Sequence, residues 1–230
     1  MNIILSNEVK LLYALISPGF AAVVQVDTKS KLYENLCQKF KADWDPSKGP
    51  CPLILTILRI VNPYLERRLN NYVEGIPWWY RKTEQYYHGT KLECKITDYY
   101  RLCGGSSCGV CGIAANGFIR SRIRTSSWQR FGNGFYLAPN SSKSHDYPIN
   151  RSSSTDQDTF RALLLCNVAP GIKYKLRENA AGLTGPPEGY HSVYGTRKSW
   201  WRDSVLNYDE IVLFDPDAIS PLYVLIYSNM

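Results

Sequence analysis

A histidine motif near the middle of the chain offers the first side chain that could bind a ligand. His88 follows two aromatic residues and precedes Gly89 and Thr90, and a glycine allows a ligand to approach the backbone closely. A neutral imidazole both donates and accepts a hydrogen bond, as binding of a sugar hydroxyl requires. Taken alone, however, His88 is more typical of a histidine that is hydrogen-bonded inside the core.

Two adjacent motifs offer flat rings and a hydroxyl. Gly132 and Gly134 lead into an aromatic strand, in which Tyr136 could form the wall of a slot for a planar group. Ser144 and Tyr147 are three residues apart and would share one face of a helix. That pair could hydrogen-bond an amide and stack on its ring. The alternatives are a plain glycine-rich turn and an ordinary capped helix on the surface.

Glu210 is the candidate for electrostatic catalysis. It opens a strongly apolar strand, Ile211 to Phe214, near the end of the chain. A carboxylate at the mouth of a buried strand is well placed to stabilise a developing positive charge. The alternative is a solvated residue at a strand end.

Four cysteines lie close together in the sequence. Their spacing, one C-x2-C step preceded by a C-x4-C step, could form a structural zinc site after His88, although it is looser than that of a zinc ribbon. Free or redox-active thiols are the alternative, as is a Cys103–Cys108 or Cys108–Cys111 disulfide in an oxidising setting. The remaining cysteines, Cys37, Cys51 and Cys166, are expected to be small buried hydrophobes. The candidate zinc ligands are Cys94, Cys103, Cys108 and Cys111.

The elements that must position these residues change along the chain. The spacing of Leu32, Leu36 and Phe40 predicts a helix over 31–40, and proline, glycine and serine indicate a loop over 41–52. An apolar strand over 53–61 precedes Asn62-Pro63, a helix start signal for 64–73. Strands dominate thereafter, which favours an α+β fold over a parallel doubly wound sheet. The later expected elements are strands at 86–88, 134–138, 160–168, 210–214 and 222–227 and a helix around Lys143.

Composition bounds the kind of protein. The net charge of +7 and pI near 9.0 suit a polyanionic ligand such as a nucleic acid or a dinucleotide, or reflect a general surface bias. Seven cysteines, an odd number, argue for a reducing compartment. The sequence has neither a membrane-length apolar run nor a secretory cleavage pattern. We therefore expect a soluble protein of the cytoplasm or nucleus, with no membrane partner.

In combination, and in this order, the motifs resemble the catalytic domain of the poly(ADP-ribose) polymerase (PARP) family, the diphtheria-toxin-like branch of ADP-ribosyltransferases with a His-Tyr-Glu triad. The resemblance runs from about residue 53 to residue 228. It implies an α+β, split antiparallel β-sheet fold with a short N-terminal helical extension, so that 1–52 would pack on a catalytic domain at 53–230. The motifs that carry it are I-L-R-I-V-N-P-Y-L at 57–65, H-G-T at 88–90, G-N-G-F-Y-L-A at 132–138, S-K-S-x-x-Y at 142–147, L-L-C-N-V-A-P-G at 164–171, H-S-V-Y-G at 191–195 and E-I-V-L-F at 210–214.

The resemblance implies a role for each motif residue on NAD, which is consumed as a substrate. His88, with Thr90 beside it, would bind the adenosine ribose. The backbone of Gly89 and the hydroxyl of Ser144 would hold the nicotinamide amide. Glu210 would bond the nicotinamide ribose and stabilise its oxocarbenium-like transition state. The rings of Tyr136 and Tyr147 would sandwich the nicotinamide.

The resemblance further implies transfer of ADP-ribose to a macromolecular acceptor, protein or nucleic acid, the reaction of a pentosyl-transferring glycosyltransferase. Only 12 residues, Thr196 to Asn207, fill the presumed acceptor loop, where polymerising members carry more, so we expect mono-ADP-ribosylation. NAD glycohydrolysis, poly-ADP-ribosylation, an inactive NAD reader and a secreted toxin are the alternatives. Trp200 and Trp201 with nearby cations could contact the acceptor. The arginines expected over the NAD pyrophosphate are Arg120, Arg122, Arg124 and Arg130.

Overall fold

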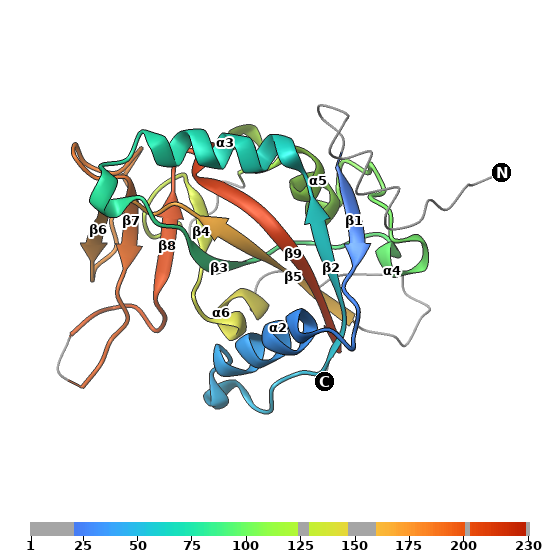
Figure 1. Cartoon of the computed structure of the whole chain (residues 1–230). Coiled ribbons are helices and arrows are strands. Elements are labelled where there is room, and N and C mark those ends of the chain that lie inside the picture. Colours follow the sequence, from blue (N-terminus) through green and yellow to red (C-terminus); the bar gives the residue numbers. More distant parts are fainter. Residues whose placement is uncertain (1–20, 124–128, 147–159, 201–202, 229–230) are drawn as a thin grey trace.

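The computed structural model describes residues 21–123, 129–146, 160–200 and 203–228. Its strands form two sheets that stand side by side (Figure 1). The first is antiparallel throughout, in the order β1-β2-β9-β5-β3. Its strands are β1 (Ala22–Gln25), β2 (Ile54–Val61), β3 (Glu84–Gly89), β5 (Phe160–Val168) and β9 (Ile219–Ser228).

The second sheet is smaller and has the order β4-β8-β7-β6. Only the β6–β7 pair is parallel, and the other pairs of this sheet are antiparallel. Its strands are β4 (Phe135–Leu137), β6 (Lys173–Leu176), β7 (Ser192–Gly195) and β8 (Glu210–Leu213).

Within the described residues, one isolated β-bridge joins the two sheets. Tyr87 of the edge strand β3 pairs with Ala138, which directly follows β4. The Tyr87 amide donates to the Ala138 carbonyl at 2.8 Å, and the Ala138 amide donates back at 2.9 Å. This junction confirms the split, mainly antiparallel α+β fold expected from the sequence.

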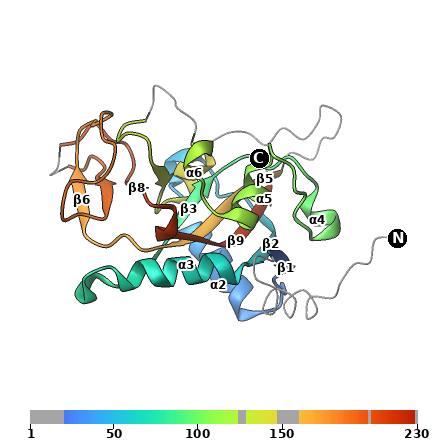
Figure 2. The ribbon, with the colours of Figure 1, turned by 90° about the horizontal axis from the view of Figure 1, so that it is seen from above.

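Helices cover the first sheet, and Figure 1 and the view from above in Figure 2 show α3 along one side of it with α2 on the other. The helices are α2 (Lys31–Ala42), α3 (Pro63–Glu74), α4 (Ile96–Tyr99), α5 (Gly109–Asn116) and α6 (Ser141–His145). Short 3₁₀ turns are η1 (Pro46–Lys48), η2 (Trp78–Tyr80), η3 (Arg120–Arg122) and η4 (Pro216–Ala218). None of the helices in the described ranges combines the length and apolar character needed to cross a membrane.

Local sequence explains the first two helices. The Ser30 side chain caps α2 by accepting from the Tyr33 amide, and Leu36 and Phe40 are buried on the sheet. Leu32, expected on the same face, is 40% exposed and extends beyond the packed stripe. Asn62 caps α3 as expected, accepting from the Leu65 amide.

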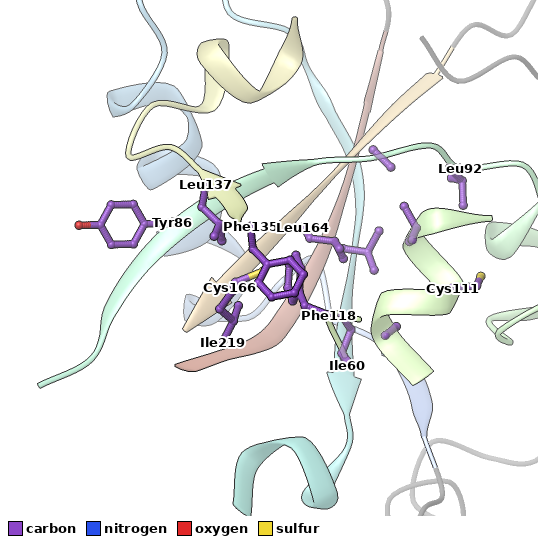
Figure 3. Packing of buried hydrophobic residues seen from close by; sticks show 14 of the residues in the cluster. Ile60, Tyr86, Leu92, Cys111, Phe118, Phe135, Leu137, Leu164, Cys166 and Ile219 are labelled. Carbon is purple, nitrogen blue, oxygen red and sulfur yellow. The ribbon is translucent and has the colours of Figure 1, made fainter. Parts of the chain in front are cut away.

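A central core lies between the two sheets (Figure 3). Alternation along β5 assigns Leu164 and Cys166 to this core and Leu163 and Leu165 to a second cluster under α2. Because the second sheet contributes to the first cluster, neither sheet can be packed without the other. The members of the central core that come from β4 and β8 are Phe135, Leu137, Ile211 and Leu213.

The described part of the N-terminal extension contributes to this fold directly. Strand β1 pairs with β2, and Phe40 of α2 is only 1% exposed. The domain division at residue 53 stays a prediction. The expectation for the isolated cysteines was right for Cys166, which is fully buried, but wrong for Cys37 and Cys51, which are half-buried because they lie at the edge of the cluster under α2.

Candidate functional site

The predicted site residues gather around the junction of the two sheets. His88 lies on β3 directly after the bridging Tyr87, and its Nδ1 is 2.9 Å from the Tyr136 carbonyl oxygen of β4. Because a carbonyl only accepts, Nδ1 carries the proton and Nε2 is left as an acceptor. Burial lowers the pKa of His88, although the bond to Tyr136 opposes the shift. The imidazole is therefore neutral at physiological pH.

Tyr136 is fixed by its own hydroxyl. This oxygen accepts from the Phe131 amide at 2.9 Å and donates to the Gly132 carbonyl at 2.8 Å. Gly132 has a φ of +78°, and a Cβ there would overlap the Leu183 carbonyl. The glycine-rich turn thus holds a half-buried tyrosine ring in one position, as the wall of a planar slot requires.

Glu210 is the most unusual group of the site. It pairs with Gly195 in the second sheet and is only 4% exposed, whereas a strand-end residue is often solvated. No residue in the described ranges donates a hydrogen bond to Oε1 of Glu210. The Lys143 Nζ lies 3.8 Å from Oε2 of the same carboxylate. Burial raises the pKa of Glu210, while the charges of Lys143 and Arg130 pull it down. A buried carboxylate with an unused oxygen is costly, and such groups cluster at functional sites.

Helix α6 carries the buried Ser144, whose hydroxyl donates to the Tyr87 carbonyl at 3.0 Å. The last turn of α2 and the loop after it hold the start of this helix. There Ser141 donates to the Phe40 and Asp43 carbonyls, and Ser142 accepts from the Asp45 amide. The N-terminal extension therefore supports a site helix. Tyr147, the predicted second ring, lies outside the described residues.

Gly89 and Thr90 follow His88 at the open edge of β3. Within the described ranges, no strand pairs with this edge beyond the Tyr87–Ala138 bridge. Thr90 lies against the first residue of α5, since a Cβ at Gly109 would overlap its hydroxyl. The ring of Phe118 covers one side of the His88 imidazole, and the centroids of the two rings are 4.9 Å apart.

Lys143 and Phe118 were missed as site residues by sequence reasoning. Lys143 stands inside the S-K-S motif, but nothing local indicates that its ammonium group faces a carboxylate on another strand. Of the four predicted arginines, Arg120 and Arg122 are exposed on η3, Arg130 bonds Asn179, and Arg124 lies outside the described residues.

The four clustered cysteines converge, as a metal site requires. Their Sγ atoms all lie within 4.8 Å of one another. None of the four forms a disulfide in the structure.

A cavity of about 630 Å³ opens elsewhere, at the outer edge of the second sheet. It is lined by β6, by Tyr194 and Thr196 at β7, and by Asp209. None of the predicted ligand-contacting side chains lines it, so it does not mark the same site.

Comparison with known proteins gives the family of the chain. A family model of the poly(ADP-ribose) polymerase catalytic domain matches residues 30–202, a range that ends before Glu210. Over 146 residues, 60% of this chain, the sequence is 26% identical to human protein mono-ADP-ribosyltransferase PARP4. The match spans only 8% of that relative's length. The chain therefore belongs to the poly(ADP-ribose) polymerase catalytic domain family.

Proposed function

We propose that the junction of the two sheets binds NAD+ and transfers its ADP-ribose to a macromolecular acceptor, one unit at a time. The observation that carries the proposal is the buried Glu210 carboxylate, whose Oε1 accepts no hydrogen bond from the residues that the structure describes. Such a group is prepared to accept one from a substrate. Its strand, β8, pairs with the strand of Tyr136, which brings the carboxylate and the aromatic wall into one sheet.

The reaction breaks the bond between the nicotinamide nitrogen and the ribose carbon. The bonding electron pair leaves with nicotinamide, which becomes neutral, and the sugar carbon becomes cationic. Glu210 accepts a hydrogen bond from the ribose hydroxyl and stabilises this charge, as carboxylates do in glycoside cleavage. An acceptor oxygen, nitrogen or sulfur then forms the new bond and loses its proton.

The remaining motif residues orient NAD+. The free Nε2 of His88 accepts from a hydroxyl of the adenosine ribose, with Thr90 beside it. The backbone of Gly89, at the open edge of β3, and the hydroxyl of Ser144 hold the nicotinamide amide. The ring of Tyr136 is held in place by the two hydrogen bonds of its hydroxyl and stacks on the nicotinamide. Tyr147 supplies the second ring.

Two observations support single rather than repeated transfer. The acceptor loop at 196–207 is short, and two hydrogen bonds connect its ends. The Lys198 amide donates to the Leu206 carbonyl, and the Ser204 hydroxyl donates to the Thr196 carbonyl. The curated relative is named a mono-ADP-ribosyltransferase. Trp200, 89% exposed in this loop, is available to an acceptor.

The test compares wild type with Glu210→Gln in adenine-labelled NAD+, with label on protein or added nucleic acid and released nicotinamide both measured. We expect discrete label for wild type and a loss of about 10²–10³-fold in rate for the variant, since one electrostatic contact to the transition state is removed. NAD+ binding, measured by calorimetry, should persist. Glu188→Gln, at an exposed glutamate, is the matched control.

Each other outcome corrects the proposal in a defined way. A ladder of label would make the protein a polymerase, and nicotinamide release without label would make it a glycohydrolase. A wild type that neither releases nicotinamide nor carries label would contradict the enzymatic proposal altogether.

A further inference from the structure

The segment that follows the histidine motif has little regular structure to hold it. Between β3 and α5, the described chain forms only the four-residue helix α4, and Tyr100 and Gly104 adopt positive φ values of 45° and 68°. Yet Leu92 and Ile96 of this segment are almost fully buried in the central core. These two side chains anchor the segment to the core, and a further link to the neighbouring helix α5 would fix the rest of it.

The four cysteine sulfurs are placed to be that link. Zinc–sulfur bonds of about 2.3 Å in a tetrahedron put neighbouring sulfurs about 3.8 Å apart. Cys94 Sγ lies 3.9 Å from Cys108 Sγ and 3.5 Å from Cys111 Sγ, and all four Sγ atoms are within 4.8 Å of one another. In Figure 3, the Cys111 sulfur points away from the packed carbon side chains of the core. We propose that these four cysteines bind one structural zinc ion.

The surroundings of the sulfurs suit a metal–thiolate centre. Cys108 and Cys111 are each 1% exposed, so these two ligands are shielded from competing water, while Cys94 is half-buried and Cys103 is exposed. Backbone amides already donate to two of the sulfurs, Glu93 to Cys108 at 3.5 Å and Gly105 to Cys103 at 3.3 Å. Such outer bonds orient ligands around a metal. Binding converts thiols to thiolates and releases their protons to solvent, so no oxidant or reductant is required.

The zinc ion braces the proposed NAD+ site, an extension that rests on the proposed function. The ligand Cys108 is the N-cap residue of α5, and Cys111 lies on the first turn of this helix. The Val110 amide of this turn donates to the Lys91 carbonyl at 3.1 Å, and Gly109 leaves no room for a Cβ against Thr90. Fixing this turn to Cys94 and Cys103 therefore fixes Thr90, which follows His88 and Gly89.

The first test measures bound metal. The full chain, purified in reducing buffer without chelator and then equilibrated with Zn²⁺ and desalted, should hold about one zinc ion per chain by mass spectrometry of the metal. Cys103→Ser, at the exposed ligand, should weaken Zn²⁺ affinity by about 10-fold or more in competition with a zinc dye. Cys51→Ser, outside the cluster, is the matched control and should bind as wild type does.

Wild type that holds no zinc after this treatment, or a Cys103→Ser protein that binds zinc like Cys51→Ser, would overturn the metal site. A wild type isolated with a disulfide among these cysteines, seen as a 2 Da loss in mass, would overturn it in favour of redox chemistry. None of these readouts depends on catalysis.

The second test concerns the brace. Removing zinc with a chelator should lower the melting temperature and weaken NAD+ binding to the Glu210→Gln protein, and added Zn²⁺ should restore both. If zinc removal leaves the NAD+ affinity unchanged, the proposal that zinc stabilises the NAD+ site is wrong, while the zinc site itself stands. If the zinc-loaded protein binds no NAD+, the proposed function fails while the zinc site stands.

Discussion

At the scale of single residues, the Glu210–Lys143 pair governs how the site responds to pH. Burial places the pKa of Glu210 above its usual range, and the nearby ammonium group at 3.8 Å opposes that rise. In the proposed reaction, stabilisation of the transition state requires the ionised Glu210 carboxylate. Transferase activity should therefore fall as pH decreases through the raised pKa of Glu210, because the carboxylate becomes protonated there.

Replacing Lys143 should shift the acidic limb of the pH–activity profile, the range in which activity falls as pH decreases. In Lys143→Met, the cation that lowers the Glu210 pKa is lost, so the pKa rises further and the limb shifts to higher pH. We expect kcat/KM to fall more at pH 6 than at pH 8, measured as nicotinamide release across the pH range. Lys29→Met, at an exposed lysine, is the control and should keep the wild-type profile. A limb that stays in place or moves to lower pH would contradict the assignment of this pair.

At the scale of elements, one buried side chain joins α3 to α5. Asn62 is 3% exposed and caps α3 through its Oδ1, while its amide donates to the Ala114 and Ala115 carbonyls at 3.0 and 2.9 Å. Those carbonyls close the C-terminal end of α5, the helix that carries Cys111. The asparagine thus does more than the N-cap that the sequence indicates.

Asn62→Ala should lower the free energy of unfolding by about 2–4 kcal/mol, from the lost cap and from one buried and one half-buried carbonyl that lose the Asn62 donor. Asn62→Asp should also destabilise, because it keeps the cap acceptor but turns a carboxylate oxygen toward the same carbonyls. Ser30→Ala, which removes a simple cap of α2, should cost about 1 kcal/mol. Urea unfolding measures all three. If Asn62→Ala lowers the free energy of unfolding by no more than Ser30→Ala does, the hydrogen bonds from Asn62 to α5 contribute nothing to stability.

At the scale of the whole molecule, both sheets depend on one core. Leu164 of β5 is fully buried in this core, which it shares with the buried Phe135 and Ile211 of the second sheet. Because side chains from both sheets fill the same volume, neither sheet keeps its packing when the other opens. The described fold should therefore unfold as one cooperative unit.

Leu164→Ala should lower the free energy of unfolding by about 2–5 kcal/mol through the cavity that it leaves. Tryptophan fluorescence and far-UV circular dichroism should report the same urea midpoint, shifted together in the variant. Leu55→Ala, at a half-exposed position on β2, should change stability by less than about 0.5 kcal/mol. Two separated transitions in wild type would mean that the sheets are energetically independent.

The sequence by itself determined much of the local structure, because helix and strand periods and capping residues act over a few neighbours. It predicted α2, the Asn62 cap of α3 and the whole of β5, and its ordered motifs indicated the family. It did not predict that Leu32 would be exposed, since a helical stripe is buried only as far as the sheet beneath it extends.

Only the tertiary structure decided which distant residues meet. The approach of Lys143 to Glu210 and the bond from His88 to the Tyr136 carbonyl each join segments that no local pattern relates. The spacing of the four cysteines suggested one set of ligands, but the distances between their sulfurs are set by the fold. The burial of Glu210 likewise depends on packing around β8 and not on its strand-end position. Sequence supplies the chemical groups, whereas their distances and desolvation, which set pKa and metal geometry, arise only when the two sheets close on one core.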